Sequence, residues 1–564
     1  MRAARTAEVA VFGGRDCDLA EDLERRELVA LSGYVRRNDA PSNARDVLEA
    51  WRDAGERTLD TLSGEFAMVV SREGSLVVLR DALGARPMYV ADLPGGGVAF
   101  GTSMLAMIHA GAPADLDYDA VARSVVLGYP TAPGTALASV RQLGPGEIWQ
   151  LAPRPGRRRW FVPRERLDAR RPLEESARAV DYALGRAVRA AVPSGERVAA
   201  FLSGGVDSSV VLAHLHESGT PVEAFTLFFG DEMPGEMRYA RAVARHLGVR
   251  QNVLEIDATA FCAGIEPSVL HLEDVVSEAI AVPNFLLARE AAKTAGALFT
   301  GEGGDQSFGG PKNVGMALAY AYATHPASRP LAHTYVSLHH YLWSDLGEAL
   351  QARVLEAFDP DRLAADVGGR FFSGAHPRKG RSFVGGVMLG NTVVKGGSNI
   401  LVKAAKMIGT AHDLAVRSPM FDRRLVDLAF TIPPWQKADG TGEKLVLRRA
   451  ALRLLPGWVV NRPKRGMTLP LAAWFAGELG VLARDVLTER AVRERGLMQW
   501  SYVERLLAVR ASARENRSAR TADKLWLALV TELHHRAIEG VARDARARRD
   551  LRRTAGREGE AASA

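Results

Sequence analysis

The stretch Ala200-Phe201-Leu202-Ser203-Gly204-Gly205-Val206-Asp207-Ser208-Ser209 decides the fold of this chain. It joins an apolar segment that predicts a strand over 197–202 to a pattern that predicts a helix over 207–216. A glycine turn at such a junction aims backbone N–H groups and the positive end of the helix dipole at an anion. The two serines add hydroxyl donors in the first helical turn. The stretch therefore predicts a phosphate cradle.

This cradle differs from a Walker loop. No Gly-Lys-Ser/Thr sequence follows the glycines, and Asp207 stands where a Walker loop has its lysine. An acid beside phosphates requires a metal ion between them. The alternative is a plain helix cap, since serine and aspartate are common at helix starts. A cap alone does not require two glycines, two serines and an acid together.

The segments around the cradle alternate between helix and strand patterns. We expect helices over 173–192 and 236–246, and strands over 222–228 and 252–255. This alternation predicts an α/β domain with a parallel sheet and crossover helices. The following residues, to about 540, are mostly helical in pattern.

A second glycine-rich loop, Gly301-Glu302-Gly303-Gly304-Asp305, follows a strand expected over 297–300. The carboxyl ends of neighbouring parallel strands line one crevice, so we expect Asp305 to face Asp207. Two carboxylates around a phosphate group are a suitable Mg²⁺ site. Alone, such a loop is more often a simple turn.

Three later segments carry further charged motifs: Arg417–Asp422, Glu443-Lys444 and Arg462-Pro463-Lys464. A lysine supplies a compact positive charge for pyrophosphate or for a developing oxyanion. Taken singly, each lysine fits a solvated surface position equally well.

The first 150 residues have a different pattern. Short β-rich runs and one helix predict a strand-rich domain, with strands over 9–12, 66–70, 76–79 and 98–100 and the helix over 44–53. The Pro- and Arg-rich segment 154–166 predicts a linker.

Composition excludes several classes of protein. The 564 residues contain 47% hydrophobic and 25% charged residues, which excludes a disordered chain. No apolar run approaches the ~20 residues of a membrane-spanning helix. Two cysteines, Cys17 and Cys262, do not make a disulfide framework, so we expect a reducing, cytoplasmic setting. The net charge of +7 is diffuse, so we expect neither a nucleic-acid nor a membrane partner.

These motifs, taken together and in order, resemble those of asparagine synthetases. The two glycine-rich loops and the segments Arg417–Asp422 and Arg462–Lys464 resemble the synthetase domain of that family. Ser63–Ala67, Arg80–Tyr89 and Leu143–Gly146 resemble its class II glutamine amidotransferase domain.

The resemblance implies a fold and a division of the chain. It implies an N-terminal Ntn-type αββα amidotransferase-like domain over 1–153, a linker over 154–172, and a PP-loop synthetase domain of the adenine-nucleotide α-hydrolase type over 173–545, with a helical C-terminal part. We expect the residues 546–564 to be a disordered tail, because they are strongly charged and poor in apolar residues.

The resemblance also implies a reaction. A substrate carboxylate attacks the α-phosphate of ATP, pyrophosphate leaves, and an amine converts the acyl-adenylate to an amide and AMP. ATP and Mg²⁺ are the implied cofactors. By position, the implied ATP- and pyrophosphate-binding residues are Leu202, Ser203, Gly204, Gly205, Asp207, Ser208, Ser209, Leu227, Gly301 and Lys444. The implied metal ligands are Asp207 and Asp305, and the implied catalytic residues are Lys464 and Glu302.

The N-terminal domain departs from the family pattern. The family's glutaminase uses a cysteine that loss of Met1 exposes, but position 2 is Arg2, and the cysteine would align near Ala7. Ser42-Asn43-Ala44-Arg45 replaces the family's Ser-Asp-x-Glu element, so both glutamine-binding carboxylates are absent. We therefore expect no glutaminase activity.

A synthetase without glutaminase must obtain its amine elsewhere. Lasso-peptide cyclases and β-lactam synthetases resemble this pattern and join a carboxylate and an amine of one substrate. β-Lactam synthetases carry a tyrosine where Glu302 stands, which favours the cyclase, or another ligase of specialised metabolism. Such an enzyme takes a small-molecule or peptide carboxylate and an amine acceptor, with a peptide-delivering protein as a further partner. An ammonia-dependent asparagine synthetase and a non-catalytic module on the same fold are two competing hypotheses.

Overall fold

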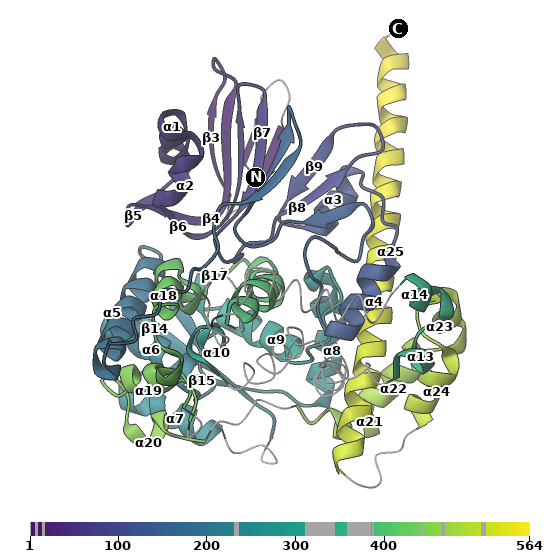
Figure 1. Cartoon of the computed structure of the whole chain (residues 1–564). Coiled ribbons are helices and arrows are strands. Elements are labelled where there is room, and N and C mark those ends of the chain that lie inside the picture. The colour runs from purple at the N-terminus through teal and green to yellow at the C-terminus, as the bar shows by residue number, and fades with distance from the viewer. Residues whose placement is uncertain are drawn as a thin grey trace, which may run out of the picture.

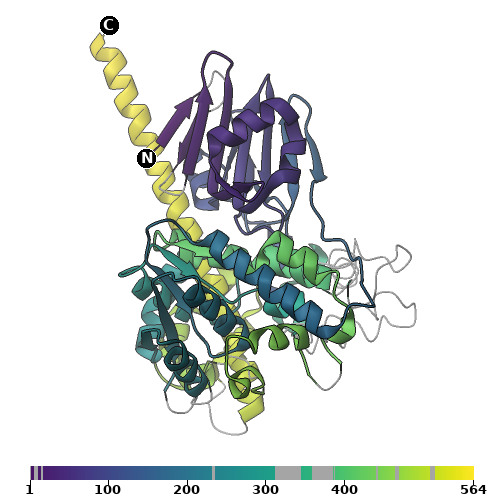
Figure 2. The same cartoon turned by 90° about the vertical axis from the view of Figure 1, so that its left-hand side faces the viewer.

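The computed structural model describes residues 17–230, 236–310, 345–357, 385, 388–439, 442–463, 469–508 and 515–563, and the backbone of 2–5 and 10–13. The described residues through Arg159 form an N-terminal domain, and those from Leu173 form a C-terminal domain. Figures 1 and 2 show the two domains side by side, with helix α25 passing along both of them.

The N-terminal domain is built on antiparallel sheets. The main sheet has the strand order β12-β11-β7-β6-β4-β3, with β5 paired to β4, and a smaller sheet has the order β10-β8-β9. Helices α1 and α2 cover the main sheet on one side, and α3 packs by the smaller sheet (Figure 1). The elements are β1 (Arg2–Arg5), β2 (Ala10–Gly13), β3 (Cys17–Asp22), β4 (Glu27–Arg37), β5 (Ala40–Ser42), α1 (Ala44–Ala54), α2 (Thr58–Thr61), β6 (Leu62–Arg72), β7 (Ser75–Arg80), β8 (Tyr89–Asp92), β9 (Val98–Gly101), α3 (Met104–Ala110), α4 (Tyr118–Leu127), β10 (Val140–Gln142), β11 (Glu147–Ala152) and β12 (Gly156–Arg159).

The segment predicted as a linker begins with a strand. Strand β12 pairs antiparallel with β11, so the main sheet continues beyond residue 153. The guanidinium of Arg157 lies 3.8 Å from the centre of the Trp149 ring, a cation–π contact that favours pairing of this arginine-rich edge strand. The linker between the two domains is therefore shorter than the sequence predicted.

The C-terminal domain contains the predicted parallel sheet. Its strand order is β15-β14-β13-β16-β17. Alternate residues of β13 face opposite ways: Val198 and Ala200 pack with α5, α6, α7 and α19, and Ala199 packs with α8 and α9. The elements up to the second glycine-rich loop are α5 (Leu173–Ala191), β13 (Val198–Phe201), α6 (Val206–Glu217), β14 (Val222–Phe228), α7 (Met237–Leu247), β15 (Gln251–Glu255), α8 (Ala258–Leu272), α9 (Ala281–Ala291), β16 (Ala297–Phe299) and α10 (Gly304–Phe308).

The remainder of the chain is mostly helical. It contains two π-helical segments, η5 (Gly390–Ile400) and η6 (Ala404–Thr410), which the short helix α17 (Leu401–Lys403) joins. The further elements are α13 (Leu346–Ala349), α14 (Ala352–Ala357), β17 (Ala415–Arg417), η7 (Pro419–Phe421), α18 (Arg423–Ala429), η8 (Pro434–Gln436), α19 (Leu445–Ala451), α20 (Gly457–Val460), α21 (Leu471–Ala476), α22 (Glu478–Val486), α23 (Glu489–Arg495), α24 (Trp500–Ala508) and α25 (Glu515–Ser563). None of these helices, within the described ranges, combines the length and the hydropathy needed to cross a membrane.

The predicted disordered tail is helical in the structure. Helix α25 continues through Ser563, and its last turns project beyond both domains (Figures 1 and 2). Alanine and arginine make up eleven of the residues 546–564, and both have high helix propensity. The polar composition that indicated disorder is therefore also compatible with a solvated helical end that continues the buried part of α25.

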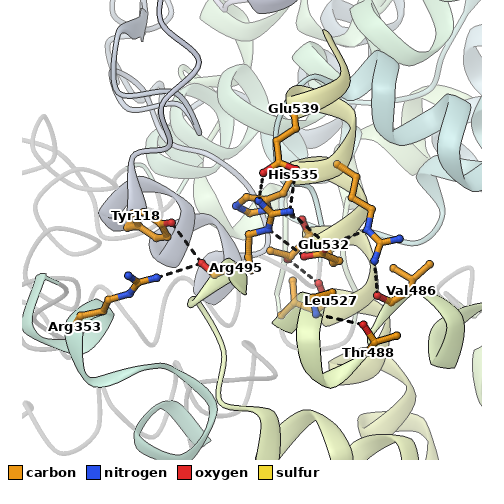
Figure 3. A network of polar contacts seen from close by, with 12 residues as sticks. Tyr118, Arg353, Val486, Thr488, Arg495, Leu527, Glu532, His535 and Glu539 are labelled. Carbon is orange, nitrogen blue, oxygen red and sulfur yellow. Dashed lines mark hydrogen bonds and ion pairs between the residues drawn. The ribbon is translucent and has the colours of Figure 1, made fainter. Parts of the chain in front are cut away.

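A polar network fixes α25 to the rest of the fold (Figure 3). The guanidinium of Arg495 lies 3.1 Å from Glu532 and 2.6 Å from Glu539, both on α25. The backbone carbonyl of Arg495 accepts hydrogen bonds from Tyr118 of the N-terminal domain, at 3.4 Å, and from Arg353, at 3.2 Å. The network therefore joins the N-terminal domain to the C-terminal helices.

Candidate active site

A cavity of about 560 Å³ lies at the carboxyl ends of β13, β14 and β16. Both glycine-rich loops contribute to its wall, together with α9, the segment 400–408 and the start of α19. Nearly all the residues predicted to bind ATP or metal line this cavity: Leu202, Ser203, Gly205, Asp207, Ser208, Leu227, Gly301, Asp305 and Lys444. Glu302, which is predicted to be catalytic, lines it as well.

The first loop folds tightly between β13 and α6. Gly204 has a φ of +73°, and a Cβ at this position would lie 2.6 Å from the backbone nitrogen of Ala240. Glycine is therefore required both by the left-handed backbone and by the close approach of α7. Within the loop, the backbone N–H of Ser203 donates to Ser208 Oγ at 3.2 Å. Gly204 and the fully buried Ser209 support the loop from outside the cavity wall.

The second loop packs directly against the first. A Cβ at Gly301 would lie 2.5 Å from the backbone nitrogen of Ser208, and one at Gly304 would lie 2.3 Å from Asp207 Oδ1. These glycines allow the two strand ends to meet without side chains between them. As a result Asp207 and Asp305 face the same point, as the sequence predicted.

Lys444 lies between these two carboxylates. Its Nζ is 2.6 Å from Asp305 Oδ1 and forms a second ion pair with Asp207 Oδ2. Burial would lower the pKa of Lys444, but the charges of Asp207 and Asp305 raise it above its ordinary value. Lys444 is therefore a permanent cation in the wall of the cavity.

The second oxygen of Asp207 is the atom best suited to a metal ion. Asp207 Oδ1 is buried and has no hydrogen-bond partner in the described structure. A buried carboxylate oxygen left unpaired is costly unless a ligand satisfies it. Hard carboxylate oxygens are the ligands that Mg²⁺ prefers, so Asp207 and Asp305 fit a Mg²⁺ ion held jointly with phosphate oxygens.

Arg462 adds a second cation that the sequence-based assignment missed. Its guanidinium lies 3.1 Å from Glu236 and 4.9 Å from the centre of the Tyr239 ring, and it faces the first loop. A Cβ at Gly205 would lie 3.4 Å from Arg462 Nη2. The motif Arg462-Pro463-Lys464 is recognisable in the sequence for its lysine, but Lys464 lies outside the described residues.

The side of the cavity near β14 is apolar. Leu202 and Leu227, predicted to enclose adenine, line it together with Phe225 and Leu287. The backbone carbonyl of Leu202 accepts a hydrogen bond from Thr226 at 2.8 Å, which fixes the end of β13. This apolar side can accept a flat base.

The opposite side, beyond β16, is charged. Glu302 lines it with Glu278 and Lys403, and Lys403 forms an ion pair with Glu278. Burial would lower the pKa of Lys403, but Glu278 and Glu302 raise it above its ordinary value. Sequence reasoning missed Lys403 and Glu278, since neither belongs to a recognisable motif. Lys403 lies between two π-helical segments, a feature often found at functional sites.

The N-terminal domain contacts the loops and helices that build this cavity. Arg80 is fully buried and donates to the backbone carbonyl of Gly397 in η5 at 2.7 Å. Glu65 accepts a hydrogen bond from the backbone N–H of Ser418 at 2.8 Å. The segments Ser63–Ala67 and Arg80–Tyr89, which carry the resemblance to the amidotransferase domain, thus hold the domain interface.

The segment aligned with the family's glutamine-binding element has another role here. Asn43 caps helix α1 by accepting from the backbone N–H of Asp46 at 3.0 Å. The Asp46 carboxylate in turn accepts from the N–H of Asn43 at 2.9 Å. This capping box stabilises the start of α1. Arg2 lies in β1, and Ala7 is outside the described residues.

Comparison with known proteins finds relatives of both domains. The family model for asparagine synthase matches residues 179–536, and that for a glutamine amidotransferase domain matches residues 26–159. Glutamine-hydrolysing asparagine synthetase 1 of Bacillus subtilis is 24% identical, over 93% of this chain and 85% of that protein. A putative glutamine-hydrolysing asparagine synthetase of Mycobacterium bovis is 29% identical, over 93% of this chain and 84% of that protein.

A β-lactam-synthase is similar to less than half of this chain. Carboxyethyl-arginine β-lactam-synthase of Streptomyces clavuligerus is 28% identical, over 44% of this chain and 47% of that protein.

The asparagine synthetase relatives that match over most of the chain, together with the family model, make this protein an ATP-dependent carbon–nitrogen ligase. The chain belongs to the asparagine synthase family.

Proposed function

We propose that this ligase adenylates a substrate carboxylate with Mg²⁺-ATP and transfers the acyl group to an amine that its own N-terminal domain does not supply. In its most specific form, the proposal is a macrolactam cyclase of the lasso-peptide type, which joins an Asp or Glu side chain of a peptide to the peptide's N-terminal amine. The observation that carries the proposal is a cavity that gathers the described residues expected to bind ATP, beside a domain whose segment Ser42–Arg45 lacks the two carboxylates of the family's glutamine-binding element.

The charge of the cavity supports the Mg²⁺ requirement. Six carboxylates and only four cationic side chains line its described wall. A triphosphate would be repelled by this wall unless divalent cations accompanied it. Mg²⁺ held by Asp207 and Asp305 would neutralise the phosphates and stabilise the leaving pyrophosphate.

The residues of the chain would act in the following way. Leu202 and Leu227 would hold the adenine, and the backbone N–H groups of the first loop, at the start of α6, would bind phosphate oxygens. Lys444 would exchange part of its contact with the two aspartates for a pyrophosphate oxygen. Glu302, on the side opposite the base, would lie by the acyl group when the amine attacks.

The features of the N-terminal domain support a reaction in which the amine comes from another molecule or from the substrate itself, and not from glutamine. The segment Ser42–Arg45, which aligns with the family's glutamine-binding element, carries a helix cap instead of two carboxylates. The β-lactam-synthase relative is named for a cyclic amide product, which supports ring closure as a reaction for a chain of this family. The two cysteines of this chain do not form a disulfide, and a reducing, cytoplasmic setting would be compatible with this.

The test uses the full chain, Mg²⁺-ATP and a set of linear peptides that carry a free N-terminus and one internal Asp or Glu. The expected result is equimolar AMP and pyrophosphate together with a peptide that has lost one water and its free amine. Peptides with a blocked N-terminus should give no cyclic product. Asparagine formed from aspartate and ammonium would instead support an ammonia-dependent asparagine synthetase, and failure to form AMP with every carboxylate tested would refute the proposal.

A further inference from the structure

A chain of buried hydrogen bonds runs from the N-terminal domain to the second glycine-rich loop. Glu65, on β6, accepts from the backbone N–H of Ser418 at 2.8 Å. The hydroxyl of Ser418 lies 3.0 Å from that of Thr300, and the backbone N–H of Thr300 donates to the carbonyl of Arg417 at 2.9 Å. Thr300 lines the cavity directly before Gly301. A side chain of the N-terminal domain is therefore linked to the cavity wall through Ser418.

The members of this chain are enclosed by protein. Glu65 is 9% exposed, and Thr300 and Ser418 are each 2% exposed. The pKa of Glu65 is raised above its ordinary value, because burial disfavours the charged form. Its acceptor oxygen, which glutamine also has, therefore matters more here than a negative charge. Leaving the buried N–H of Ser418 without that acceptor would be costly, so Glu65 fixes the position of Ser418.

The segment 417–423 contacts the N-terminal domain at two further points. The Arg417 guanidinium lies 4.4 Å from the centre of the Tyr34 ring. Arg423 donates to the backbone carbonyls of Leu59, at 3.3 Å, and Leu62, at 3.2 Å. These contacts hold one side of the segment against β4, α2 and the start of β6.

The other side of the same segment supports the second loop. Gly303 has a φ of +113°, and a Cβ at this position would lie 2.8 Å from the Cβ of Met420. The loop therefore rests directly on η7, with no side chain of Gly303 between them. Glu302 and Asp305, on either side of this glycine, are the residues expected at the acyl group and at the metal ion. A shift of the segment would move both of them.

We infer that Glu65 is a positioning residue of the synthetase reaction, which through Ser418 and Thr300 holds the second glycine-rich loop in place beside the first. The N-terminal domain then has a task in that reaction whether or not it hydrolyses glutamine. The inference rests on the proposed ATP site, because it concerns the placement of Glu302 and Asp305 in that site.

The two ends of the bound nucleotide should respond differently to loss of Glu65. The adenine is expected against Leu202 and Leu227, which belong to the first loop and to β14, whereas the second loop supplies Asp305 beside the phosphates. Glu65→Ala should therefore weaken binding of Mg²⁺-ATP and leave binding of AMP close to that of the wild type. A variant that had merely lost stability would bind both nucleotides less well.

The experiment measures the affinities of the full chain for Mg²⁺-ATP and for AMP by calorimetry, without a carboxylate substrate. Glu65→Ala should reduce the ratio of the two affinities about tenfold, the scale of one buried hydrogen bond. Glu65→Gln keeps an acceptor oxygen and should retain the wild-type ratio. Ser418→Ala keeps the backbone N–H but removes the hydroxyl that meets Thr300, so it should also lower the ratio.

Two further variants separate positioning from a general loosening of the domain interface. Glu65→Ala/Ser418→Ala should be no worse than the more affected single variant, since both residues act through one chain. Asp39→Asn is the matched control. Asp39 pairs with Arg186, at 2.9 Å, and with Arg424 across the same interface, and neither partner belongs to the hydrogen-bond chain. Its ratio should equal that of the wild type.

An unchanged ratio in either Glu65→Ala or Ser418→Ala, or an equal fall in Asp39→Asn, would overturn the inference. If Glu65→Ala does not fold, which loss of AMP binding shows, Ser418→Ala decides the question. A wild type that binds Mg²⁺-ATP no more tightly than AMP refutes the proposed ATP site and this inference with it. A wild type that prefers Mg²⁺-ATP, with a ratio that neither substitution changes, refutes the inference alone.

Discussion

Lys444 Nζ lies 2.6 Å from Asp305 Oδ1 and also forms an ion pair with Asp207, so one buried cation joins the two glycine-rich loops. Lys444 itself has a φ of +55°, in the left-handed region, at the residue before α19. A backbone held in this region for a non-glycine residue indicates that the surrounding structure fixes it. The relationship suggests that the site is held ready for a phosphate group before ATP arrives.

Replacement of Lys444 tests this relationship. In Lys444→Met the two carboxylates face each other without a cation, and pyrophosphate loses a positive partner. We expect the rate of AMP formation to fall by about 100-fold or more, as for loss of one preorganised charge-stabilising group. The measurement is steady-state AMP release, with the exposed Lys293→Met as the control, which should match the wild type.

The proposed metal ligands give a second prediction. Asp207→Ala and Asp305→Ala should each abolish AMP formation, because each removes a carboxylate that fits Mg²⁺. Chelation of divalent cations by EDTA should have the same effect on the wild type and should be reversed by added Mg²⁺. Normal turnover of either variant would remove that residue from the metal site.

A buried lysine away from the site predicts a pH-dependent stability. Burial lowers the pKa of Lys437 to about 7, and its Nζ lies 3.2 Å from Met388 Sδ. Between pH 7 and the ordinary lysine pKa of about 10.4, the unfolded chain binds more protons than the folded chain, so stability falls as pH drops through this window. The variant Lys437→Met has no group to titrate at this position, so it should not show this loss of stability at lower pH.

The expected gain for Lys437→Met is about 3 kcal/mol at pH 8 and about 1 kcal/mol at pH 9.5, at 1.36 kcal/mol for each unit between pH and the ordinary pKa. The melting temperatures of variant and wild type, measured across this range, should diverge as pH falls. A difference that is constant with pH would show that Lys437 is already charged in the folded protein.

The domain interface provides a fourth prediction. Lys406 Nζ lies 2.9 Å from Glu273, which also accepts from Ser103 Oγ at 2.7 Å and from the Met104 N–H at 2.6 Å. Lys406→Met should cost about 3–5 kcal/mol, because it leaves Glu273 buried without its counter-charge. Thermal unfolding measures this loss.

The double variant Lys406→Met/Glu273→Gln is the control for that prediction. It removes both charges, while the glutamine keeps an acceptor for Ser103 and Met104, so much of the stability should return. Because Met407 and Ile408 of the same segment line the cavity, the single variant should also raise the KM for ATP. A single variant as stable as the wild type would show that the pair does not hold the domains together.

The local parts of the site could be predicted from the sequence. The phosphate cradle and the second loop are continuous segments, and strand β14 matches its expected bounds of 222–228. The crevice that brings Asp207 to Asp305 follows from the parallel order of the strands, which the alternation of patterns indicates.

The parts that depend on distant packing could not be predicted. Lys403 and Glu278 come from segments more than a hundred residues apart, and neither has a local pattern that marks it. Arg462 acts through its contact with Glu236, which only the fold creates. The prediction of disorder beyond residue 546 was wrong, because a highly charged composition is shared by disordered tails and by solvated helices.

The central claim, an active synthetase beside an inactive glutaminase domain, is tested most directly by one measurement: AMP, pyrophosphate and glutamate formed by the full chain with Mg²⁺-ATP. The reactions compare aspartate with glutamine, aspartate with ammonium, and the linear peptides. The account predicts equimolar AMP and pyrophosphate with a peptide, and no glutamate under any condition. Glutamate released from glutamine in step with asparagine formation would contradict it.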